Sequence, residues 1–465
     1  MASLLWWPTA LVVLAACGGE GAGTSPPSVE GLEGPRAERV VFAVMDTVRA
    51  DHLSVYGYPR PTTPALEALA ETATLYTRAQ AVAPWTLPSH ASMFTGLYPF
   101  EHGAHTRGTP DEVEPAGALA ESHATLAEEL RDHGFRTGAF VANRAYLARR
   151  YGIHQGFDTY RVERLPAARI TERALDWIDE SPEQPSFLFL NYMDAHTPYS
   201  CAPRPEFPTP GGPPEARRVH EELTELVLAR EQEAPADRIA AHVAQYDTAL
   251  ANLDEALGAL VRGLRERGLF EDTLLVITSD HGEYFGEQRL IGHGVDVYQG
   301  ALRVPLIVKQ PRQVSSRVDA DPISHVHLPG LVLASTLGAE GLTSGAFRDH
   351  WPRGAVLSEN YFALPNVVRH EWSERFRRVR TALLDGDLKY IHSSDGAHAL
   401  YDLSRDPREA SNLVDAEPER ARDLQERLQA LMPDARRARE HTGVEAPTDE
   451  ELADMKALGY ADDDS

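Results

Sequence analysis

Cysteine and positive charge are what this sequence most plainly lacks. Its 465 residues include two cysteines, and 45 Lys and Arg stand against 70 Asp and Glu, which gives a formal net charge of −25. An acidic excess this large favours solubility and argues against nucleic acid as a partner. It does not exclude an anionic substrate, because a metal ion and a few local cations can dominate a pocket.

A hydrophobic run long enough to cross a bilayer is missing from the start of the chain. Residues 1–17, MASLLWWPTALVVLAAC, are apolar but short, which indicates the apolar part of a signal peptide. They end in Leu14-Ala15-Ala16-Cys17, which resembles the lipobox of bacterial lipoproteins, where the cysteine is acylated and becomes the new N-terminus. Lys and Arg are absent before the apolar part, which departs from the usual pattern, and a plain signal peptide is the alternative.

The residues after Cys17 predict how the protein is attached. Residues 18–37 are rich in Gly, Ser and Pro, as expected of a flexible tether. Several acyl chains would anchor it stably in a membrane, whereas a single chain binds weakly. With Cys17 acylated, Cys201 has no partner for an intrachain disulfide. The expected location is therefore the bacterial cell envelope, on the periplasmic or outer-membrane side.

Short apolar runs alternate with amphipathic stretches over most of the chain. Strands are expected at 39–44, 136–141, 186–192, 273–278 and 304–308, and helices at 63–71, 87–95, 126–133 and 239–267. This alternation predicts an α/β fold over residues 38–350, a mostly parallel central sheet flanked by helices. Residues 351–432 are expected to form a smaller C-terminal subdomain of antiparallel sheet plus helix, with strands at 376–384, 388–392 and 399–403 and a helix at 419–431. Residues 433–465 are expected to form a tail, frayed at its acidic end.

Polar, ionisable residues stand where three of the predicted strands end. Asp46 follows the first strand, Asp194 and His196 follow the strand at 186–192, and Asp280 and His281 follow the strand at 273–278. One acid after a strand is commonly a cap or a turn residue. Three such groups at one sheet edge, where ligands bind in open α/β sheets, point instead to a site. Carboxylates with an imidazole suit a divalent metal ion.

Several motifs in the right order make the chain similar to the sulfatase family of the alkaline phosphatase superfamily. The resemblance covers about residues 38–415 and extends over VVFAVMDTVRADHLSVYGY, APWTLPSHASMFTGLYPFEHG, NYMDAHTPY, TSDHGEYFGEQRLIGHG, KYI and LYDLSRDPREASNL. It implies an ester hydrolase with one divalent ion, Ca, Mg, Mn or Zn. By position, the implied metal ligands are Asp46, Thr86, Asp280 and His281, and Thr86 is also the implied nucleophile.

The chain also lacks residues that this family usually keeps. Thr86 replaces the Cys or Ser that sulfatases oxidise to formylglycine, and His90 replaces the following Arg. The expected Lys-x-His pair after residue 141 is missing, with Asn143 nearby, and His293 stands where a Lys is usual. Relatives with Thr at the nucleophile position, such as phosphoethanolamine transferases and nucleotide pyrophosphatases, act on phosphoesters.

The remaining polar residues receive separate interpretations. His196 and His293 are candidates for protonating the leaving group, since histidine titrates near working pH. His90 and Asn143 are candidate substrate contacts. Asp194 could orient a ligand, or form a second metal site with the two histidines. Surface solvation is expected for His102, His105 and Arg107, loop structure for Glu283 and Glu287, and a turn cap for Asp51-His52.

These features predict a metal-dependent hydrolase or transferase of phosphate mono- or diesters that works outside the cytoplasm through a covalent Thr86 intermediate. One alternative is a sulfuric ester hydrolase that works without formylglycine. A second is a catalytically inactive lipoprotein that binds an envelope ligand. The ester could be a small molecule, a lipid head group or a glycan, because the Pro- and Glu-rich loop 203–234 carries no readable motif. Oligomeric state is not indicated.

Overall fold

The structure, a computed structural model, describes most of the chain after residue 34. The described residues are 35–109, 112–199, 204–208, 213–338, 354–363, 365–368, 370–432, 443–458 and 460–461. The predicted signal peptide with Cys17, most of the predicted tether, and Cys201 lie outside them. Within these ranges, no helix combines the length and the apolar character needed to cross a membrane.

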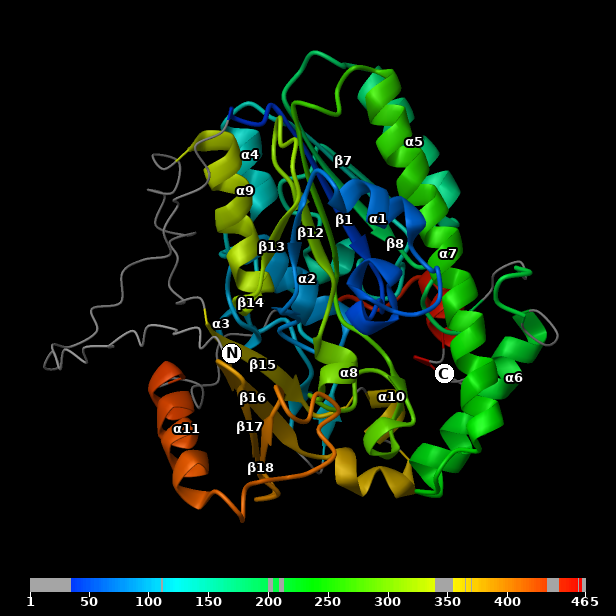
Figure 1. The fold of residues 1–465 in the computed structure, drawn as a ribbon, viewed down its shortest axis with the longest axis vertical. Coiled ribbons are helices and arrows are strands. Elements are labelled where there is room, and N and C mark those ends of the chain that lie inside the picture. Colours follow the sequence, from blue (N-terminus) through cyan, green and yellow to red (C-terminus); the bar gives the residue numbers. More distant parts are fainter. Residues whose placement is uncertain are drawn as a thin grey trace, which may run out of the picture.

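An eight-stranded, mostly parallel sheet forms the centre of the molecule (Figure 1), in the order β13-β2-β12-β9-β1-β8-β6-β7. The strands are β1 (Arg39–Met45), β2 (Thr74–Tyr76), β6 (Arg136–Val141), β7 (Thr159–Val162), β8 (Ser186–Tyr192), β9 (Thr273–Ser279), β12 (Leu306–Lys309) and β13 (Arg317–Asp319). β1 pairs in parallel with both β8 and β9, and β12 runs antiparallel to β9. This confirms the predicted sheet and places the ends of β1, β8 and β9 side by side.

Helices cover both faces of the sheet because its central strands are apolar on both sides. Every residue of β1 is buried; Phe42 packs into one hydrophobic core and Val41 into the other. Figure 1 shows α2, α4 and α9 on one face and α1, α5 and α7 on the other. Their bounds are α1 (Pro64–Ala70), α2 (Thr86–Thr95), α4 (Leu126–Asp132), α5 (Ala167–Asp179), α7 (Ala236–Glu266) and α9 (Leu328–Leu337).

A second, four-stranded antiparallel sheet lies below the first in Figure 1, with helix α11 against it. Its elements are β15 (Ala355–Tyr361), β16 (Val379–Asp385), β17 (Leu388–Ser393), β18 (Ala399–Asp402) and α11 (Pro418–Leu431). The sequence had not indicated β15. Leu383 and Leu424 share one hydrophobic core with Phe42, so apolar packing is continuous between the two sheets.

A buried ion pair ties the C-terminal motifs to the rest of the fold. Lys389 Nζ lies 2.6 Å from Glu409 Oε1, and both side chains are almost fully buried. The other carboxylate oxygen of Glu409 accepts a 2.6 Å hydrogen bond from the backbone N–H of Gln299. Gln299 begins the short helix α8 (Gln299–Leu302), whose Leu302 packs in the shared core. The KYI and DPREASNL motifs therefore have a structural role.

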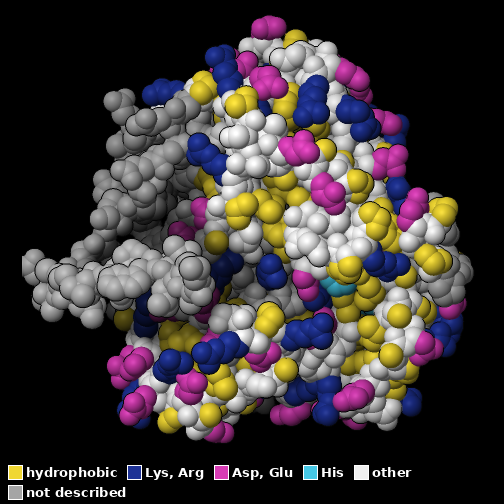
Figure 2. Space-filling view, viewed as in Figure 1, with side chains coloured by type: hydrophobic (Ala, Val, Ile, Leu, Met, Phe, Trp, Pro, Cys, Tyr) yellow, Lys and Arg dark blue, Asp and Glu magenta, His cyan; other side chains and the backbone are white. Residues whose placement is uncertain are grey.

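The segment predicted as a tail contains helix α12 (Asp449–Ala457), coloured red in Figure 1. Thr448 caps it: its hydroxyl accepts from the N–H of Glu451, whose carboxylate accepts from the N–H of Thr448. The remaining elements are α3 (Pro99–His102), α6 (Pro213–Leu223), α10 (Pro365–Val368), β3 (Ala79–Gln80), β4 (Arg107–Gly108), β5 (Val113–Glu114), β10 (Tyr284–Phe285), β11 (Ile291–Gly292) and β14 (Ile323–Ser324). Figure 2 shows acidic and basic side chains interspersed over one face, so the acidic excess is not gathered into one patch there.

Candidate metal centre and active site

Three of the predicted metal ligands meet at the carboxyl edge of the large sheet. Asp46 directly follows β1, and Asp280 and His281 directly follow β9. One ligand atom from each lies within 4.8 Å of the other two, and all three side chains are fully buried. Parallel pairing of β1 with β9 produces this meeting, because it brings the two strand ends to the same level.

Each of these side chains keeps one atom without a hydrogen-bond partner among the described residues. These atoms are Asp46 Oδ1, Asp280 Oδ2 and His281 Nε2. The Nδ1–H of His281 donates to the Gly282 carbonyl at 2.9 Å, so the Nε2 lone pair faces the two carboxylates, 3.5 Å from Asp280 and 4.0 Å from Asp46. Buried, unpaired charges are strongly unfavourable unless they bind an ion. These donors therefore fit a divalent cation.

The pKa shifts of Asp46 and Asp280 also favour a cation between them. Burial, and then the nearby Asp46 carboxylate, raise the pKa of Asp280 well above its ordinary value. Burial also opposes ionisation of Asp46, but His196, His281 and the hydrogen bond from Asn143 together lower its pKa. Two carboxylates this close repel each other when both are ionised, and a cation between them removes that repulsion.

The chain bends sharply after Asp46. Thr47 has a φ of 62°, which is unusual for a β-branched residue. Its hydroxyl donates to the Ala195 carbonyl at 2.7 Å, and its carbonyl accepts from Tyr246 at 2.9 Å. Its N–H then points at Asp280 Oδ1, 3.2 Å away. Strain of this kind persists where surrounding bonds hold it, and here it accompanies the placement of both acids.

A glycine is required immediately after the ligands of β9. A Cβ on Gly282 would lie 2.2 Å from the carbonyl oxygen of Gly300 and 2.9 Å from the Arg49 side chain. The N–H of Gly282 donates to the Ala301 carbonyl at 2.7 Å, which fixes the loop after His281 against α8. The glycine of the Asp-His-Gly motif is therefore explained by this close approach.

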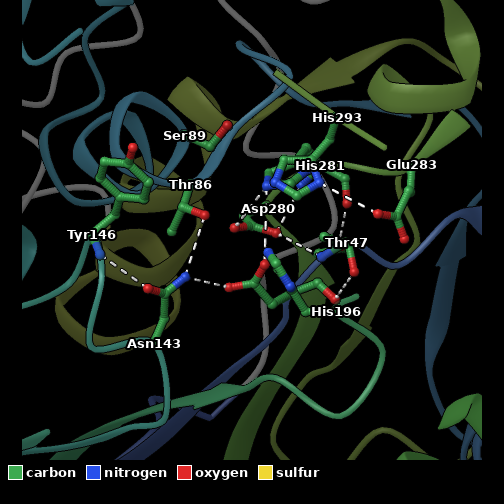
Figure 3. A network of polar contacts seen from close by, with 12 residues as sticks. Thr47, Thr86, Ser89, Asn143, Tyr146, His196, Asp280, His281, Glu283 and His293 are labelled. Atoms are coloured by element: carbon green, nitrogen blue, oxygen red, sulfur yellow. Dashed lines mark hydrogen bonds and ion pairs between the residues drawn. The ribbon is translucent and has the colours of Figure 1, made fainter. Parts of the chain in front are cut away.

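Thr86 is the first residue of α2, at the positive end of the helix dipole. Its side chain is buried, and it is linked to the metal cluster through Asn143 (Figure 3): Asn143 Nδ2 lies 2.9 Å from Asp46 Oδ2 and 3.4 Å from Thr86 Oγ1. The Asn143 carbonyl oxygen accepts from the N–H of Tyr146 at 3.0 Å. Asn143 was predicted to contact substrate, whereas its amide here connects Thr86 to a metal ligand.

His90 lies one turn into α2 and is also engaged with the site. Its Nδ1–H donates to the Thr86 carbonyl at 2.9 Å, and the same nitrogen lies 3.7 Å from Asp280 Oδ2. Burial lowers the pKa of His90 to about 4. The imidazole is therefore neutral at pH 7, unlike the arginine usual at this position, and it lies behind the nucleophile with no exposed surface.

His196 and His293 form the other end of the site. Their rings lie 4.9 Å apart, and the ring of His293 lies 4.6 Å from that of His281. The Nδ1–H of His196 donates to the Thr197 carbonyl at 2.5 Å, and His293 Nδ1 faces Glu283 at 3.5 Å. Burial lowers the pKa of both imidazoles, and the neighbouring histidines lower them further.

Asp194 does not join them. Its carboxylate accepts a 2.9 Å hydrogen bond from the N–H of Ala167 at the start of α5, and burial raises its pKa to about 6. In the parts of the chain that the structure describes, one group of three or more His, Cys, Asp or Glu side chains is close enough to hold a metal ion. It consists of Asp46, Asp280 and His281. The optional second metal site with Asp194 is therefore not formed.

The sequence interpretation missed two residues of the site. The Tyr460 hydroxyl lies 2.7 Å from His196 Nε2 and 2.9 Å from His293 Nε2. Glu283, interpreted as loop structure, is fully buried and accepts hydrogen bonds from Thr197 and Tyr199. The capping pattern at Thr448 and Glu451 could have indicated the helix before Tyr460, but no local signal indicates where that helix docks.

The predictions for the neighbouring polar residues have mixed outcomes. His102 and His105 are buried rather than solvated, and His102 Nε2 lies 3.1 Å from Ser92 Oγ. That prediction was wrong because α3, which ends at His102, packs against α2. Glu287 does have the expected loop role: with Asp51 it holds the buried Arg49, each at 2.8 Å.

The fold and the site together define a metal-dependent ester hydrolase of the alkaline phosphatase type: an open α/β sheet with two acids and an imidazole at its carboxyl edge, beside a helix that begins with a hydroxyl. The sequence model of the Sulfatase family matches residues 38–338, and the chain belongs to this family. This confirms the resemblance found in the motifs and the assignment to ester hydrolases.

Known proteins are similar to this chain over most of its length. It is 23% identical to "Uncharacterized sulfatase YidJ" of Escherichia coli, over 81% of this chain and 82% of the relative, and 24% identical to the "Ulvan-active sulfatase" of Formosa agariphila, over 83% and 79%. The phosphonate monoester hydrolase of Agrobacterium radiobacter has the same fold, with a TM-score of 0.66, 20% identity, and coverage of 88% of this chain and all of the other. A protein solved with its substrate D-glucosamine-2-N,6-O-disulfate gives a TM-score of 0.64 at 18% identity, with coverage of 86% and 98%.

Proposed function

We propose that the protein cleaves phosphate mono- or diesters, or transfers their phosphoryl group, through a covalent intermediate on Thr86. The observation that carries this proposal is the Thr86–Asn143–Asp46 chain of contacts, which holds a threonine hydroxyl beside a fitted cation site. Asp46, Asp280 and His281 would hold the cation. When bound, a divalent cation polarises the ester and lowers the pKa of a hydroxyl that it touches.

The chain's own groups account for the two halves of the reaction. The Thr86 hydroxyl gives up its proton to water and its oxygen forms a bond to phosphorus while the bond to the leaving oxygen breaks, which gives a phosphothreonine ester and, once the leaving oxygen is protonated, an alcohol. The leaving oxygen takes its proton from the protonated form of His196 or His293, the imidazoles at the far end of the site. Water, or an acceptor alcohol in a transfer, then breaks the bond between Thr86 and phosphorus and restores the hydroxyl.

Threonine favours phosphate over sulfate for a chemical reason. A sulfatase with formylglycine expels sulfate from a carbon that carries two hydroxyls, whereas threonine carries one. A sulfothreonine ester would have to be released by attack at sulfur. Sulfuric ester hydrolysis remains the second candidate, because the chain belongs to the sulfatase family and its relatives include an ulvan-active sulfatase. An inactive binding protein is the third, and the intact buried ligand set argues against it.

A substrate screen with three variants tests the proposal. Wild type, Thr86→Ala, Thr86→Ser and Asn143→Ala would be assayed on phosphomonoesters, phosphodiesters, phosphonate monoesters and sulfate esters, with Ca, Mg, Mn or Zn added. We expect the best substrate to be a phosphate ester, its turnover to vanish in Thr86→Ala, and part of it to remain in Thr86→Ser, which keeps a hydroxyl. Full turnover in Thr86→Ala would remove Thr86 from the mechanism, and a preference for sulfate esters would favour the second candidate.

We also propose that Cys17 carries the lipid anchor and that the enzyme works in the bacterial cell envelope. The support is the Leu14-Ala15-Ala16-Cys17 pattern and the Gly-, Ser- and Pro-rich stretch after it. Membrane fractionation of wild type and Cys17→Ala tests this. The wild type should sediment with membranes and the variant should not be acylated; equal acylation of both would refute the anchor.

A further inference from the structure

Tyr460 joins the two histidines that the mechanism uses at the leaving group. Its hydroxyl lies between His196 Nε2, at 2.7 Å, and His293 Nε2, at 2.9 Å. The Nδ1 of His196 donates to the Thr197 carbonyl, so its Nε2 carries a lone pair and accepts the Tyr460 proton. The Tyr460 oxygen can then accept from the Nε2–H of His293. The hydroxyl thus both donates and accepts, as an alcohol product would.

Neither histidine is available to a substrate while Tyr460 stays there. The two nitrogens of His196 are engaged by Thr197 and Tyr460, and those of His293 face Glu283 and Tyr460. A leaving-group oxygen that is to take a proton from either imidazole has to come within hydrogen-bond distance of an Nε2 atom. That position is the one the phenol oxygen fills.

The ring of Tyr460 also has a defined environment. It packs edge-on against Tyr146, with centroids 4.9 Å apart, and against His196 and His293 at 5.9 and 6.2 Å. Tyr146 is held in turn by an edge contact with Trp85, which directly precedes Thr86. Offset and edge-on aromatic contacts of this kind select an aromatic ring. The pocket that surrounds Tyr460 therefore suits a phenol.

Ion pairs of unequal exposure hold the segment that delivers Tyr460: the Arg150–Glu451 pair is mostly buried, whereas Glu450 is exposed, and Met455 and Leu458 pack against the hydrophobic core. Arg144 contacts Glu450 at 2.6 Å and Asp454 at 3.2 Å, and Arg150 contacts Glu451 at 2.6 Å. The Glu450 side chain is 75% exposed. The exposed pair with Glu450 contributes little and weakens with salt, so the docking of this segment can be weakened from the surface without changing the site.

We propose that the space between His196, His293 and Tyr146 is the subsite for an aromatic alcohol leaving group, and that Tyr460 occupies it as an internal competitor. The inference rests on the proposed function for its chemistry. It makes aryl esters the substrate class, and substrate binds by displacing Tyr460 together with α12. Competition of this kind raises KM by the reciprocal of the undocked fraction and leaves kcat unchanged.

Enzyme kinetics on the full chain test the competition. Tyr460→Ala should lower KM for an aryl ester such as 4-nitrophenyl phosphate by about fivefold or more, with kcat unchanged. The double variant Glu450→Gln/Asp454→Asn, which still contains Tyr460, should also lower KM. Glu180→Gln, which removes an exposed ion pair with Arg136 outside this region, is the matched control and should change nothing. A lower kcat in Tyr460→Ala or Tyr460→Phe would show that Tyr460 belongs to the catalytic machinery and would overturn the proposal, as would an unchanged KM.

Phenol binding separates this proposal from the proposed function. Calorimetry with 4-methylphenol should give at least fivefold tighter binding to Tyr460→Ala than to wild type, and the same difference in a Thr86→Ala background, where turnover is absent. Equal binding of 4-methylphenol to wild type and Tyr460→Ala would refute the subsite even if the phosphate chemistry is correct. Tight phenol binding in a protein that hydrolyses no phosphate ester would keep the subsite and reject the proposed function.

Discussion

The two ends of the site are held in opposite ways. Asp46, Asp280 and His281 come from strand ends of the central sheet, and their inward atoms have no partner among the described residues. At the other end, both ring nitrogens of His196 are hydrogen-bonded, to Thr197 and to the distant Tyr460, and His293 Nε2 is hydrogen-bonded to the same tyrosine hydroxyl. The first end presents buried donor atoms that suit a cation, whereas at the second the Tyr460 hydroxyl lies where an alcohol oxygen would bind.

This difference separates the part of the site that the central sheet positions from the part that loops and a distant segment complete. The metal end depends on β1 and β9, which pair along their whole length, so its geometry follows from the fold. The histidine end depends on loops and on α12, which docks through partly exposed ion pairs. The metal end is thus built into the sheet, whereas the histidine end is completed by loops and by a segment distant in the sequence.

Removing a ligand from the metal end should have the largest effect. Asp46→Asn should lower kcat/KM by about 10³ or more, because a catalytic metal supplies several kcal/mol. Elemental analysis of the purified variant should show loss of the divalent ion. Asp194→Asn is the matched control: this buried acid follows the neighbouring strand but caps α5, so its variant should keep the metal. Equal metal content in wild type, Asp46→Asn and Asp194→Asn would refute the metal site.

A change at the histidine end should separate activity from metal binding. His293→Ala should lower kcat by about 10²–10⁴, the usual range for loss of a general acid. The effect should shrink for esters with acidic leaving groups, such as 4-nitrophenol, which depart without a proton. Metal content should stay at the wild-type value. Loss of the metal in this variant would mean that the two ends are not independent.

Glu283 tests how the second end is positioned. Its carboxylate lies 3.5 Å from His293 Nδ1 and accepts from Thr197 and Tyr199. Glu283→Gln should lower kcat about tenfold, as expected for a partner that orients a catalytic group. The pH profile of kcat should shift with it, which a purely structural role would not cause. Glu287→Gln, in the same loop, is the control.

The smallest effect should appear in the pH dependence of stability. The pKa of His90 is about 4 in the fold and about 6.5 when unfolded, so the unfolded chain binds the proton more tightly. The contribution of His90 to the free energy of unfolding is therefore fully present above about pH 6.5. It falls by about 1.4 kcal/mol per pH unit as the pH drops toward 4. Urea denaturation at pH 7.0 and 5.5 should show His90→Gln losing about 1.4 kcal/mol less than wild type. Equal losses would mean that His90 is protonated in the fold.

Much of the fold could be predicted from local patterns. The runs at 136–141 and 186–192 form strands with the predicted bounds, since an unbroken apolar run between polar residues has few other structures. β15 was missed because SEN in Ala355–Tyr361 is polar, although the strand is almost entirely buried. Ser358 there donates to the Ala81 carbonyl, so tertiary hydrogen bonds make its polar groups compatible with burial.

The residues of the site also divide into those that local patterns indicate and those that depend on tertiary contacts. Asp46, Asp280 and His281 could be found because each follows a buried strand, and parallel pairing brings strand ends together. Asn143 was located, but its hydrogen bonds to Asp46 and Thr86 could not be predicted, since they depend on three separate elements. Tyr460 could not be found, because its partners lie 264 and 167 residues away in the sequence.

The sequence alone therefore determined the family, the α/β fold and the acids and imidazole of the metal end, because strand polarity and period are local properties of the chain. Only the tertiary structure decided that Asn143 links nucleophile to metal ligand, that Asp194 caps a helix, and that the chain near residue 460 returns to the site. The physical reason is that these contacts join distant segments whose docking depends on shape and charge complementarity, which no local pattern records.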